Sequence, residues 1–319
     1  MSRPPALADT REELAHLLAV ARKDGRRVAF VPTMGALHDG HAALMRTARA
    51  YAGDGPVVVS VFVNPLQFAP GEDLDRYPRT LEADLARCAA EGVDVVYAPG
   101  IDDVYPTGEP AVTVDPGPLG EVLEGASRPT HFRGVLTVVA KLFGLVRPDV
   151  AVFGEKDYQQ LALIRGMTAD LCLDVEVVGA ETVREADGLA LSSRNRYLSA
   201  DDRQRATVLS RSLLRAREAS GAGVWAALTA ARAELDGEPG VDVDYLEIVA
   251  TDLTPLPADV PAGTTARILV AARVGTTRLI DNLPITIGVS TRTRSSPGST
   301  NDETGATDDD TTAAPQGDS

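Results

Sequence analysis

The chain has 319 residues and a formal net charge of −15, from 31 lysines and arginines against 46 aspartates and glutamates. The length predicts about two domains. The acidic balance argues against nucleic-acid binding through a broad basic face, no apolar run approaches the ~20 residues that span a bilayer, and the N-terminus does not resemble a signal peptide. The two cysteines lie far apart in sequence, which excludes a disulfide framework. We expect a cytoplasmic protein that binds neither membranes nor nucleic acid.

Short β-rich runs alternate with helical patterns along residues 1–185. In chain order the pattern predicts a strand at 27–31, a helix at 40–52, a strand at 57–63, a helix at 81–90, a strand at 93–98, a helix at 134–146, a strand at 150–153, a helix at 158–171 and a strand at 175–178. Such alternation is typical of βαβ units. The expected fold class is α/β, with a Rossmann-like parallel sheet covered by helices on both faces, and ligands bind beyond the carboxyl ends of such strands.

The pattern changes in residues 186–289, which we expect to form a smaller α+β domain. Helices are predicted at 201–218 and 224–235, and short strands at 244–249, 267–272 and 278–280. Residues 290–319 have no aromatic side chain and carry two basic against six acidic residues. Such a segment buries too little apolar surface to offset its ordering entropy, so it is predicted to be a disordered acidic tail.

The first predicted strand runs into PTMGALHDGH, residues 32–41, which carries His38 and His41. Glycines allow close backbone approach here, and the following helix points its N-terminal amides at the turn. Imidazoles at this place can bind nucleotide phosphate. Two alternatives remain: a helix cap with a packed histidine, and a zinc pair, for which a third ligand at a suitable spacing is missing. The dinucleotide pattern G-x-G-x-x-G is absent from this turn, which weakens an oxidoreductase interpretation.

Polar residues also follow the next strands. Asn64 and Gln67 are neutral amides that can orient a hydroxyl or a carboxylate. Lys156 suits a phosphate, and Asp157 suits ribose hydroxyls or a magnesium-bound water. The alternatives are loop residues that bond to their own backbone and a surface capping sequence.

Three further features complete the set of candidates. Gln159 and Gln160 face different sides of a helix start, and we favour Gln160 as the one that reaches a ligand. The loop LSSRNRYLS, residues 191–199, offers two hydroxyls and a guanidinium for a phosphate clamp, with an N-cap cluster as an equal alternative. A basic loop carries Arg128 and His131, and a solvated charge cluster is its equal alternative.

Together, the segments PTMGALHDGH, FVNPLQF, RYPRT, LEGASRPTHFRGV, FGEKDYQQL and DGLALSSRNRYLS resemble one family, the pantothenate synthetases or pantoate–β-alanine ligases. The resemblance covers residues 28–287. The family belongs to the nucleotidyltransferase superfamily related to class I aminoacyl-tRNA synthetases, and HDGH and LSSRN resemble the two signatures of that superfamily. It implies an AMP-forming ligase that condenses (R)-pantoate with β-alanine through a pantoyl adenylate, in pantothenate and coenzyme A biosynthesis.

The resemblance also implies roles for individual residues. Catalytic roles fall to His41, His38, Lys156 and Arg194. ATP binding falls to Met34, Gly35, Ala36, Leu37, His38, Asp39, Gly40, His41, Gly154, Glu155, Lys156, Asp157, Val183, Leu191, Ser192, Ser193 and Arg194. Pantoate binding falls to Gln67, Gln160 and Asn64, and β-alanine binding to Gln67. The family assigns His41 as a proton donor, whereas pyrophosphate displacement asks more for charge stabilisation, so both roles stay open.

Mg²⁺ is expected to accompany ATP through phosphates and water rather than direct protein ligands, and the family forms homodimers. Leu66 stands where the family commonly has Met, a swap of little consequence. Two rival functions remain open. One is a nucleotidyltransferase that stops after adenylating or cytidylylating its substrate. The other is a non-catalytic nucleotide-binding protein on the same fold.

Overall fold

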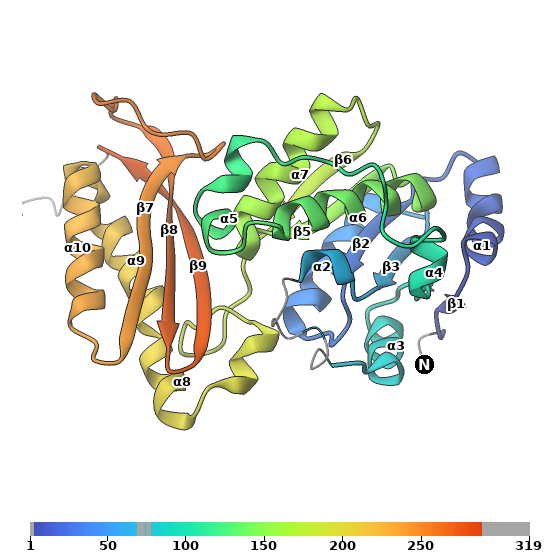
Figure 1. The fold of residues 1–319 in the computed structure, drawn as a ribbon, viewed down its shortest axis with the longest axis horizontal. Helices are drawn as coiled ribbons and strands as arrows, with labels where there is room; N and C mark the ends of the chain where they lie inside the picture. The colour runs from blue at the N-terminus through green and yellow to red at the C-terminus, as the bar shows by residue number, and fades with distance from the viewer. Residues whose placement is uncertain (1–2, 69–73, 75–77, 289–319) are drawn as a thin grey trace, which may run out of the picture.

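The structure, a computed structural model, describes residues 3–68, 74 and 78–288. A larger N-terminal part built on a parallel sheet and a smaller C-terminal part built on an antiparallel sheet lie side by side along the long axis (Figure 1). The predicted acidic tail, residues 290–319, lies outside the described residues. Within the described residues, no helix combines the length and the apolar character needed to cross a bilayer.

The larger sheet has six parallel strands in the order β1-β4-β3-β2-β5-β6. The strands are β1 (Ala6–Ala8), β2 (Ala29–Thr33), β3 (Val57–Val61), β4 (Val95–Tyr97), β5 (Val150–Gly154) and β6 (Glu176–Ala180). Ala29 of β2 pairs with Val57 on one side and with Val150 on the other. The strand order therefore reverses at β2 and β5, and such a switch point opens a crevice at the carboxyl edge of the sheet.

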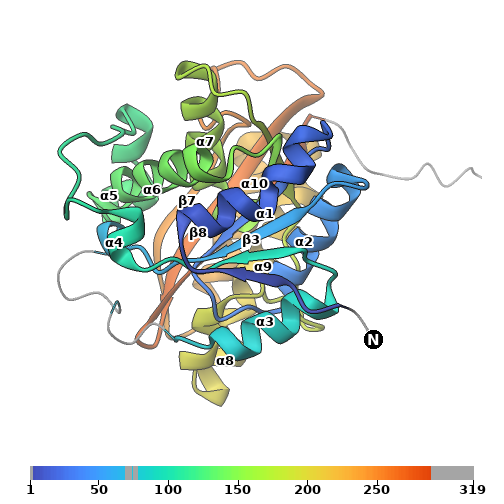
Figure 2. The same cartoon turned by 90° about the vertical axis from the view of Figure 1, so that its right-hand side faces the viewer.

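Helices cover both faces of this sheet, as the alternation of strands and helices predicts (Figures 1 and 2). One face carries α1 (Arg11–Lys23), α6 (His131–Val146) and α7 (Tyr158–Asp170), and the other carries α2 (Asp39–Ala52) and α3 (Leu81–Ala90). Because side chains alternate along a strand, Phe30 joins the core under α6 and α7, whereas Val31 joins the core with Met45 of α2. Both faces are packed against apolar side chains, which explains why the strands are mostly hydrophobic rather than alternating with polar residues.

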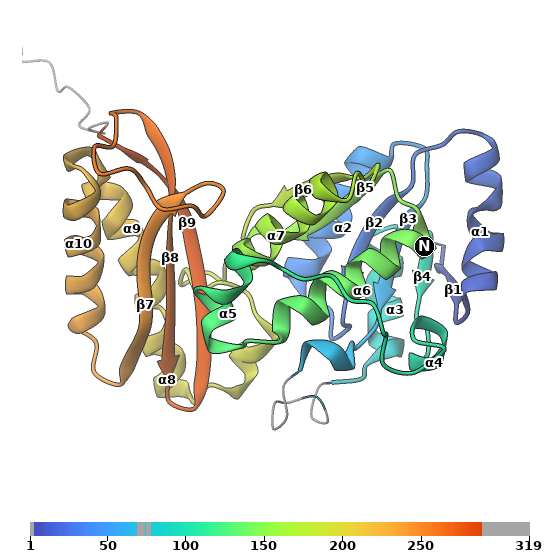
Figure 3. The same cartoon turned by 45° about the horizontal axis from the view of Figure 1, so that its top comes forward.

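The smaller part is a three-stranded antiparallel sheet, β7 (Val241–Ala250), β8 (Thr264–Val274) and β9 (Thr277–Ile287), backed by α9 (Val208–Ala219) and α10 (Val224–Asp236). Ile268 faces the core beneath these helices, whereas its neighbour Leu269 packs into the core of the N-terminal part. Figure 3 shows the same layering, with α10 outermost and β9 turned toward α5 (Glu124–Ser127). One face of the antiparallel sheet thus packs against its own helices, and the other face packs against the N-terminal part.

The α/β fold class predicted from the sequence is confirmed, while several predicted bounds are wrong. The helix expected at 201–218 is two helices, α8 (Ala200–Ala206) and α9, because Thr207 donates its N–H to the carbonyl of Gln204 and tightens the turn between them. The C-terminal strands are longer than expected, and β1 and α1 were not predicted. The domain boundary at residue 185 stays a prediction; it falls in a hairpin where Arg184 bridges Ala190.

The remaining short helices lie in connections. They are α4 (Ile101–Val104), η1 (Pro65–Gln67), η3 (Pro118–Glu121), η4 (Glu155–Asp157), η5 (Ser193–Tyr197) and η6 (Ser220–Ala222). Three of them, η1, η4 and η5, contain the polar motifs that follow the strands. The motifs therefore sit on tight turns that project from the carboxyl edge of the sheet.

Candidate functional site

A cavity of about 260 Å³ opens at the carboxyl edge of the parallel sheet, where the strand order reverses. Five separate stretches of sequence meet around it. The predicted site residues that line it are Met34, His38, Gly40, His41, Gln67, Gly154, Lys156, Asp157, Gln160, Val183, Leu191, Ser192, Ser193 and Arg194. The structure therefore brings most of the predicted constellation together in one cleft.

The two histidines lie at the start of α2 with their rings 4.2 Å apart. The Nδ1 atom of His38 accepts the backbone N–H of Gly40 at 3.1 Å, and the Nδ1 atom of His41 accepts the backbone N–H of His38 at 3.2 Å. The alternative of a helix cap is thus correct for the Nδ1 atoms, which both accept backbone N–H groups at the start of the helix. Because Nδ1 acts as an acceptor in both rings, the hydrogen of each neutral imidazole is on Nε2, where it can be donated to a ligand.

Burial keeps both imidazoles uncharged. Desolvation, with a smaller contribution from His38, lowers the pKa of His41 to about 3. Desolvation and the nearby cations Lys156 and Arg87 also hold the pKa of His38 below its usual range. At neutral pH the pair therefore offers neutral N–H donors rather than imidazolium ions.

The glutamines at the start of α7 divide their roles as the sequence pattern predicts. Gln160 lines the cavity. Gln159 is buried and bonds to the connection before α5: its side-chain nitrogen donates to the carbonyls of Leu119 and Val122, and its oxygen accepts from the N–H of Glu124. Gln159 is therefore a structural residue, and Gln160 is the one that can meet a ligand.

Six predicted site residues are not among those that line the cavity: Gly35, Ala36, Leu37, Asp39, Asn64 and Glu155. Asp39 and Glu155 pair with arginines instead, Arg87 at 2.7 Å and Arg267 at 3.0 Å. Of the other four, Gly35, Ala36 and Asn64 are buried and Leu37 is half-buried. For these six residues a supporting role fits their positions better than direct contact.

Asn64 illustrates such a supporting role. Its side chain is buried and donates to Gln67 Oε1 at 3.3 Å and to the carbonyl of Gly134 at 3.1 Å, and it accepts from the Tyr105 hydroxyl at 2.8 Å. Gln67 in turn donates to the sulfur of Met34. Asn64 therefore holds Gln67 against the turn that carries Met34.

Asp84 of α3 was missed by the sequence reasoning. Its buried carboxylate accepts the backbone N–H groups of Ala36 at 3.1 Å and Leu37 at 2.8 Å. Ala36 has a positive φ of 52°, which is unfavourable for a residue with a Cβ. Asp84 therefore fixes a strained turn directly before the histidines, and only the three-dimensional fold could reveal it, since 47 positions separate Asp84 and Leu37.

The opposite wall of the cavity is cationic. Lys156 lies on η4, and Arg194 lies on η5. The Ser192 hydroxyl caps the start of η5 by accepting the backbone N–H of Arg194 at 3.2 Å. Desolvation opposes the ionisation of Asp157, but Lys156 and Arg194 outweigh it and hold the pKa of Asp157 below its ordinary value. The wall can bind a polyanion, with one carboxylate set among its cations.

The basic loop before α6 also reaches the cavity. Arg128 and His131 line it, and both bond to the carbonyl of Gln67, Arg128 Nη2 at 3.3 Å and His131 Nδ1 at 2.9 Å. They were considered from the sequence but not included among the predicted site residues. Their position adds positive charge close to Gln67.

An apolar wall completes the cavity, and it was not predicted. It is formed by Leu44, Phe62, Val135, Val138, Val139, Leu142 and Phe153. Four of these come from α6, for which the sequence pattern predicted a helix but no contact with a ligand. One side of the cavity therefore suits a branched hydrocarbon group.

A second cavity of about 700 Å³ lies between the two parts of the molecule. It shares Lys156, Asp157, Gln160 and Arg194 with the first cavity and adds Arg273 and other residues of β7–β9. The two spaces are thus contiguous at the cationic wall. In the part of the chain that the structure describes, no group of three or more histidine, cysteine, aspartate or glutamate side chains is placed to hold a metal ion, which leaves the zinc alternative without support.

Comparisons with known proteins identify the family. Residues 6–284 match the sequence model described as Pantoate-beta-alanine ligase. The chain belongs to the pantoate–β-alanine ligase family. It is 67% identical over 312 residues to the pantothenate synthetase of Nocardioides sp. strain JS614, covering 94% of this chain and 93% of that protein.

Solved structures agree. The crystal structure of pantothenate synthetase from Thermus thermophilus is 53% identical, with a TM-score of 0.80 over 87% of this chain and 98% of that one. The pantoate–β-alanine ligase of Francisella tularensis, solved with β,γ ATP and β-alanine, is 32% identical, with a TM-score of 0.70 over 88% and 97% of the two chains. The ligase function predicted from the sequence is confirmed at the level of this family.

Proposed function

We propose that this one cleft activates the carboxylate of (R)-pantoate with ATP and then transfers the pantoyl group to β-alanine. The proposal rests chiefly on one observation: His38, His41, Lys156 and Arg194 meet around a single cavity that also holds Gln67 and Gln160. The ATP and β-alanine bound to the Francisella tularensis relative support the same substrates here.

In the first step, a carboxylate oxygen of pantoate forms a bond to the α-phosphorus of ATP. The bond from that phosphorus to the β-phosphate bridging oxygen breaks, and pyrophosphate leaves. Two anions must meet in line, so positioning and neutralisation of charge lower the barrier most. Lys156 and Arg194 are placed to bind the phosphates, while the apolar wall and Gln160 are placed to hold the hydrocarbon body and hydroxyls of pantoate.

In the second step, the amine of β-alanine attacks the acyl carbon of the adenylate. The bond between that carbon and the phosphate oxygen breaks, AMP leaves, and the amine loses a proton to solvent. Adenylation makes the carboxyl carbon a good electrophile because AMP is a good leaving group. Gln67, which lies beside Arg128 and His131, is the residue that we assign to β-alanine as well as to pantoate.

The histidines act in this scheme as hydrogen-bond donors. Because burial lowers the pKa of His41 to about 3, we assign it as a neutral hydrogen-bond donor rather than as a general acid. Its Nε2–H instead stabilises the negative charge that develops on the α-phosphate. Of the two roles that the resemblance leaves open, we therefore propose charge stabilisation.

Mg²⁺ fits this site as a partner of the nucleotide. The described residues supply no cluster of metal ligands, so the ion would be held by ATP phosphates and water, with Asp157 the nearest carboxylate on the cationic wall. Bound in this way, it would neutralise the triphosphate.

We also propose that the enzyme is a cytoplasmic homodimer. Light scattering of the purified protein tests whether it is a dimer.

A substrate-omission assay tests the proposal. Pyrophosphate release should require pantoate, and AMP release at a steady rate should require β-alanine in addition. A nucleotidyltransferase that stops at the adenylate would release pyrophosphate at the same rate with or without β-alanine. A protein that only binds nucleotide would release neither product.

A further inference from the structure

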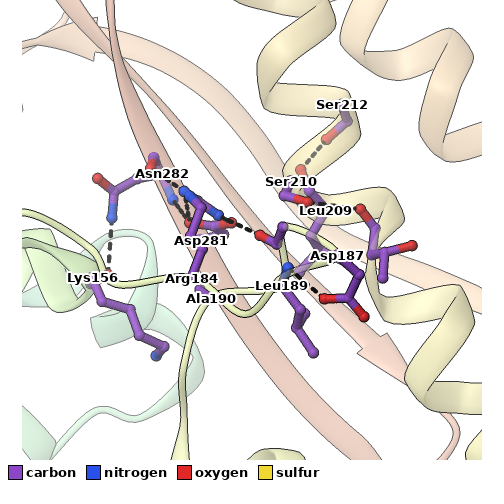
Figure 4. A network of polar contacts seen from close by, with 12 residues as sticks. Lys156, Arg184, Asp187, Leu189, Ala190, Leu209, Ser210, Ser212, Asp281 and Asn282 are labelled. Carbon is purple, nitrogen blue, oxygen red and sulfur yellow. Dashed lines mark hydrogen bonds and ion pairs between the residues drawn. The ribbon is translucent and has the colours of Figure 1, made fainter. Parts of the chain in front are cut away.

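Two adjacent residues of β9 in the C-terminal part, Asp281 and Asn282, contact the two loops that lead to Lys156 and Arg194 at the cleft. Both are buried, with 3% of their surface exposed. Figure 4 shows Asn282 bonded to the backbone of Lys156 and Asp281 bonded to Arg184. Neither residue lines the first cavity, so the catalytic scheme above gives them no part.

Asn282 holds the loop that carries Lys156. Its side-chain nitrogen donates to two successive backbone carbonyls, those of Glu155 and Lys156, each at 2.9 Å. Its side-chain oxygen accepts from Arg267 Nη1 at 2.5 Å. Since η4 is a single short turn, these two donated bonds fix the backbone from which the Lys156 side chain projects.

Arg267 reinforces the same contact. Its guanidinium lies 3.6 Å from the centre of the Tyr158 ring, and its Nη2 donates to the Glu155 carboxylate at 3.0 Å. The arginine is buried, and Asn282 orients it through the amide oxygen. Arg267 on β8 and Asn282 on β9 therefore hold the segment from Glu155 to Tyr158 in place together.

Asp281 holds the second loop. Its carboxylate binds Arg184 in a bidentate ion pair, at 2.6 and 2.9 Å. Arg184 also donates to the Gly188 carbonyl and so closes the hairpin in which the Leu191 N–H donates to the Val183 carbonyl. That hairpin leads directly into residues 191–194, which carry the hydroxyls and Arg194.

We infer that Asp281 and Asn282 are positioning residues that set the spacing between Lys156 and Arg194 across the cleft. Asp281 accepts the backbone N–H of Asn282 at 2.8 Å, so the contacts of Asp281 with Arg184 and of Asn282 with the Lys156 loop form one rigid unit. The C-terminal part thus serves the adenylation step through the placement of two loops. A misplacement of about 1 Å in a phosphate-binding cation can cost about 10²-fold in rate.

The test compares Asn282→Asp with the parent enzyme. This substitution keeps the shape and the acceptor for Arg267 but removes both N–H donors to the loop carbonyls. We expect pantoate-dependent pyrophosphate release to fall about 10- to 10²-fold, with the KM for β-alanine unchanged. Asn282→Ala is measured alongside, so that the result does not depend on one variant that fails to fold. Ser212→Ala, which removes a buried hydrogen bond to the Leu209 carbonyl in the same part, is the control.

A double-mutant cycle separates positioning from simple stabilisation. If Asn282 acts through Lys156, then Asn282→Asp in a Lys156→Ala background should cost little more than Lys156→Ala alone. Fully additive losses, or a variant whose melting temperature falls while its turnover per folded enzyme stays at the parent value, would overturn the inference. Failure of the ligase assay in the parent enzyme would instead contradict the proposed function.

Discussion

The Nδ1 atom of His41 accepts the backbone N–H of His38 at 3.2 Å, so the helix cap and the proposed phosphate site share one imidazole. The cap fixes the tautomer, and the tautomer directs Nε2–H into the cleft, which both histidines line. The two interpretations of this turn, structural cap and phosphate ligand, are therefore compatible. The N-terminus of α2 adds its backbone amides to the same place.

His41→Ala should lower pantoate-dependent pyrophosphate release by about 10²-fold or more, the usual cost of a lost preorganised donor. Steady-state kinetics measure this directly. His16→Ala is a matched control, because His16 lies on the exposed face of α1 and should leave the rate unchanged. Near-parental turnover of the His41 variant would mean that the turn has been misinterpreted.

The low pKa of His41 predicts a specific pH dependence. An unfolded histidine takes up a proton near pH 6.5, whereas His41 in the fold does so only near pH 3. The unfolded chain therefore binds the extra proton first as the pH falls, and the free energy of unfolding should decline between these values. Urea unfolding at a series of pH values should show that the free energy of unfolding declines less steeply with falling pH in His41→Gln than in the parent. Nitrogen-15 NMR should find His41 neutral at pH 5; titration near pH 6.5 would contradict this.

The neighbouring glutamines of α7 give a paired prediction. Gln160→Ala should raise the KM for pantoate about 10-fold, the value of a lost hydrogen bond to a ligand, with little change in stability. Gln159→Ala breaks three internal hydrogen bonds and should lower the free energy of unfolding by about 2 kcal/mol. Chemical denaturation together with pantoate titration separates the two. The reverse pattern would mean that the assignment of the pair is exchanged.

Asp84→Ala should affect both stability and ATP affinity. It leaves the N–H groups of Ala36 and Leu37 without their acceptor, at a cost of about 2 kcal/mol or more. The turn before His38 then relaxes, and the KM for ATP should rise while that for β-alanine does not. Glu82→Ala, on the exposed side of the same helix, is the control. Unchanged ATP kinetics would exclude a positioning role for Asp84.

The parallel sheet and the strand-end motifs could be predicted because each rests on local pattern. Val57–Val61 is apolar except for Ser60, and the polar residues that follow it lie at the carboxyl edge, as the α/β rule requires. That Gln159 and Gln160 face different sides, so that only one of them reaches the cleft, also followed from local helix geometry. These features depend on residues within a few positions of one another.

The missed features depend on contacts between distant segments. Asp84 supports a turn 47 positions earlier, and Asn282 contacts carbonyls more than 120 positions away. The apolar wall on α6 was missed for another reason: Val135 and Val139 follow the same spacing whether they face a core or a cleft. Ligand binding by Asn64 and Glu155 stays a prediction, and a sequence does not show the internal bonds that both side chains already make.

The central claim is that pantoate is activated as an adenylate in this cleft. Pantoate labelled with oxygen-18 in its carboxylate tests it, because the attacking oxygen stays on the phosphorus when AMP leaves. After turnover with ATP and β-alanine, mass spectrometry should find one oxygen-18 atom in AMP and the other in the amide of pantothenate. Unlabelled AMP, or ADP and labelled phosphate in its place, would contradict the account.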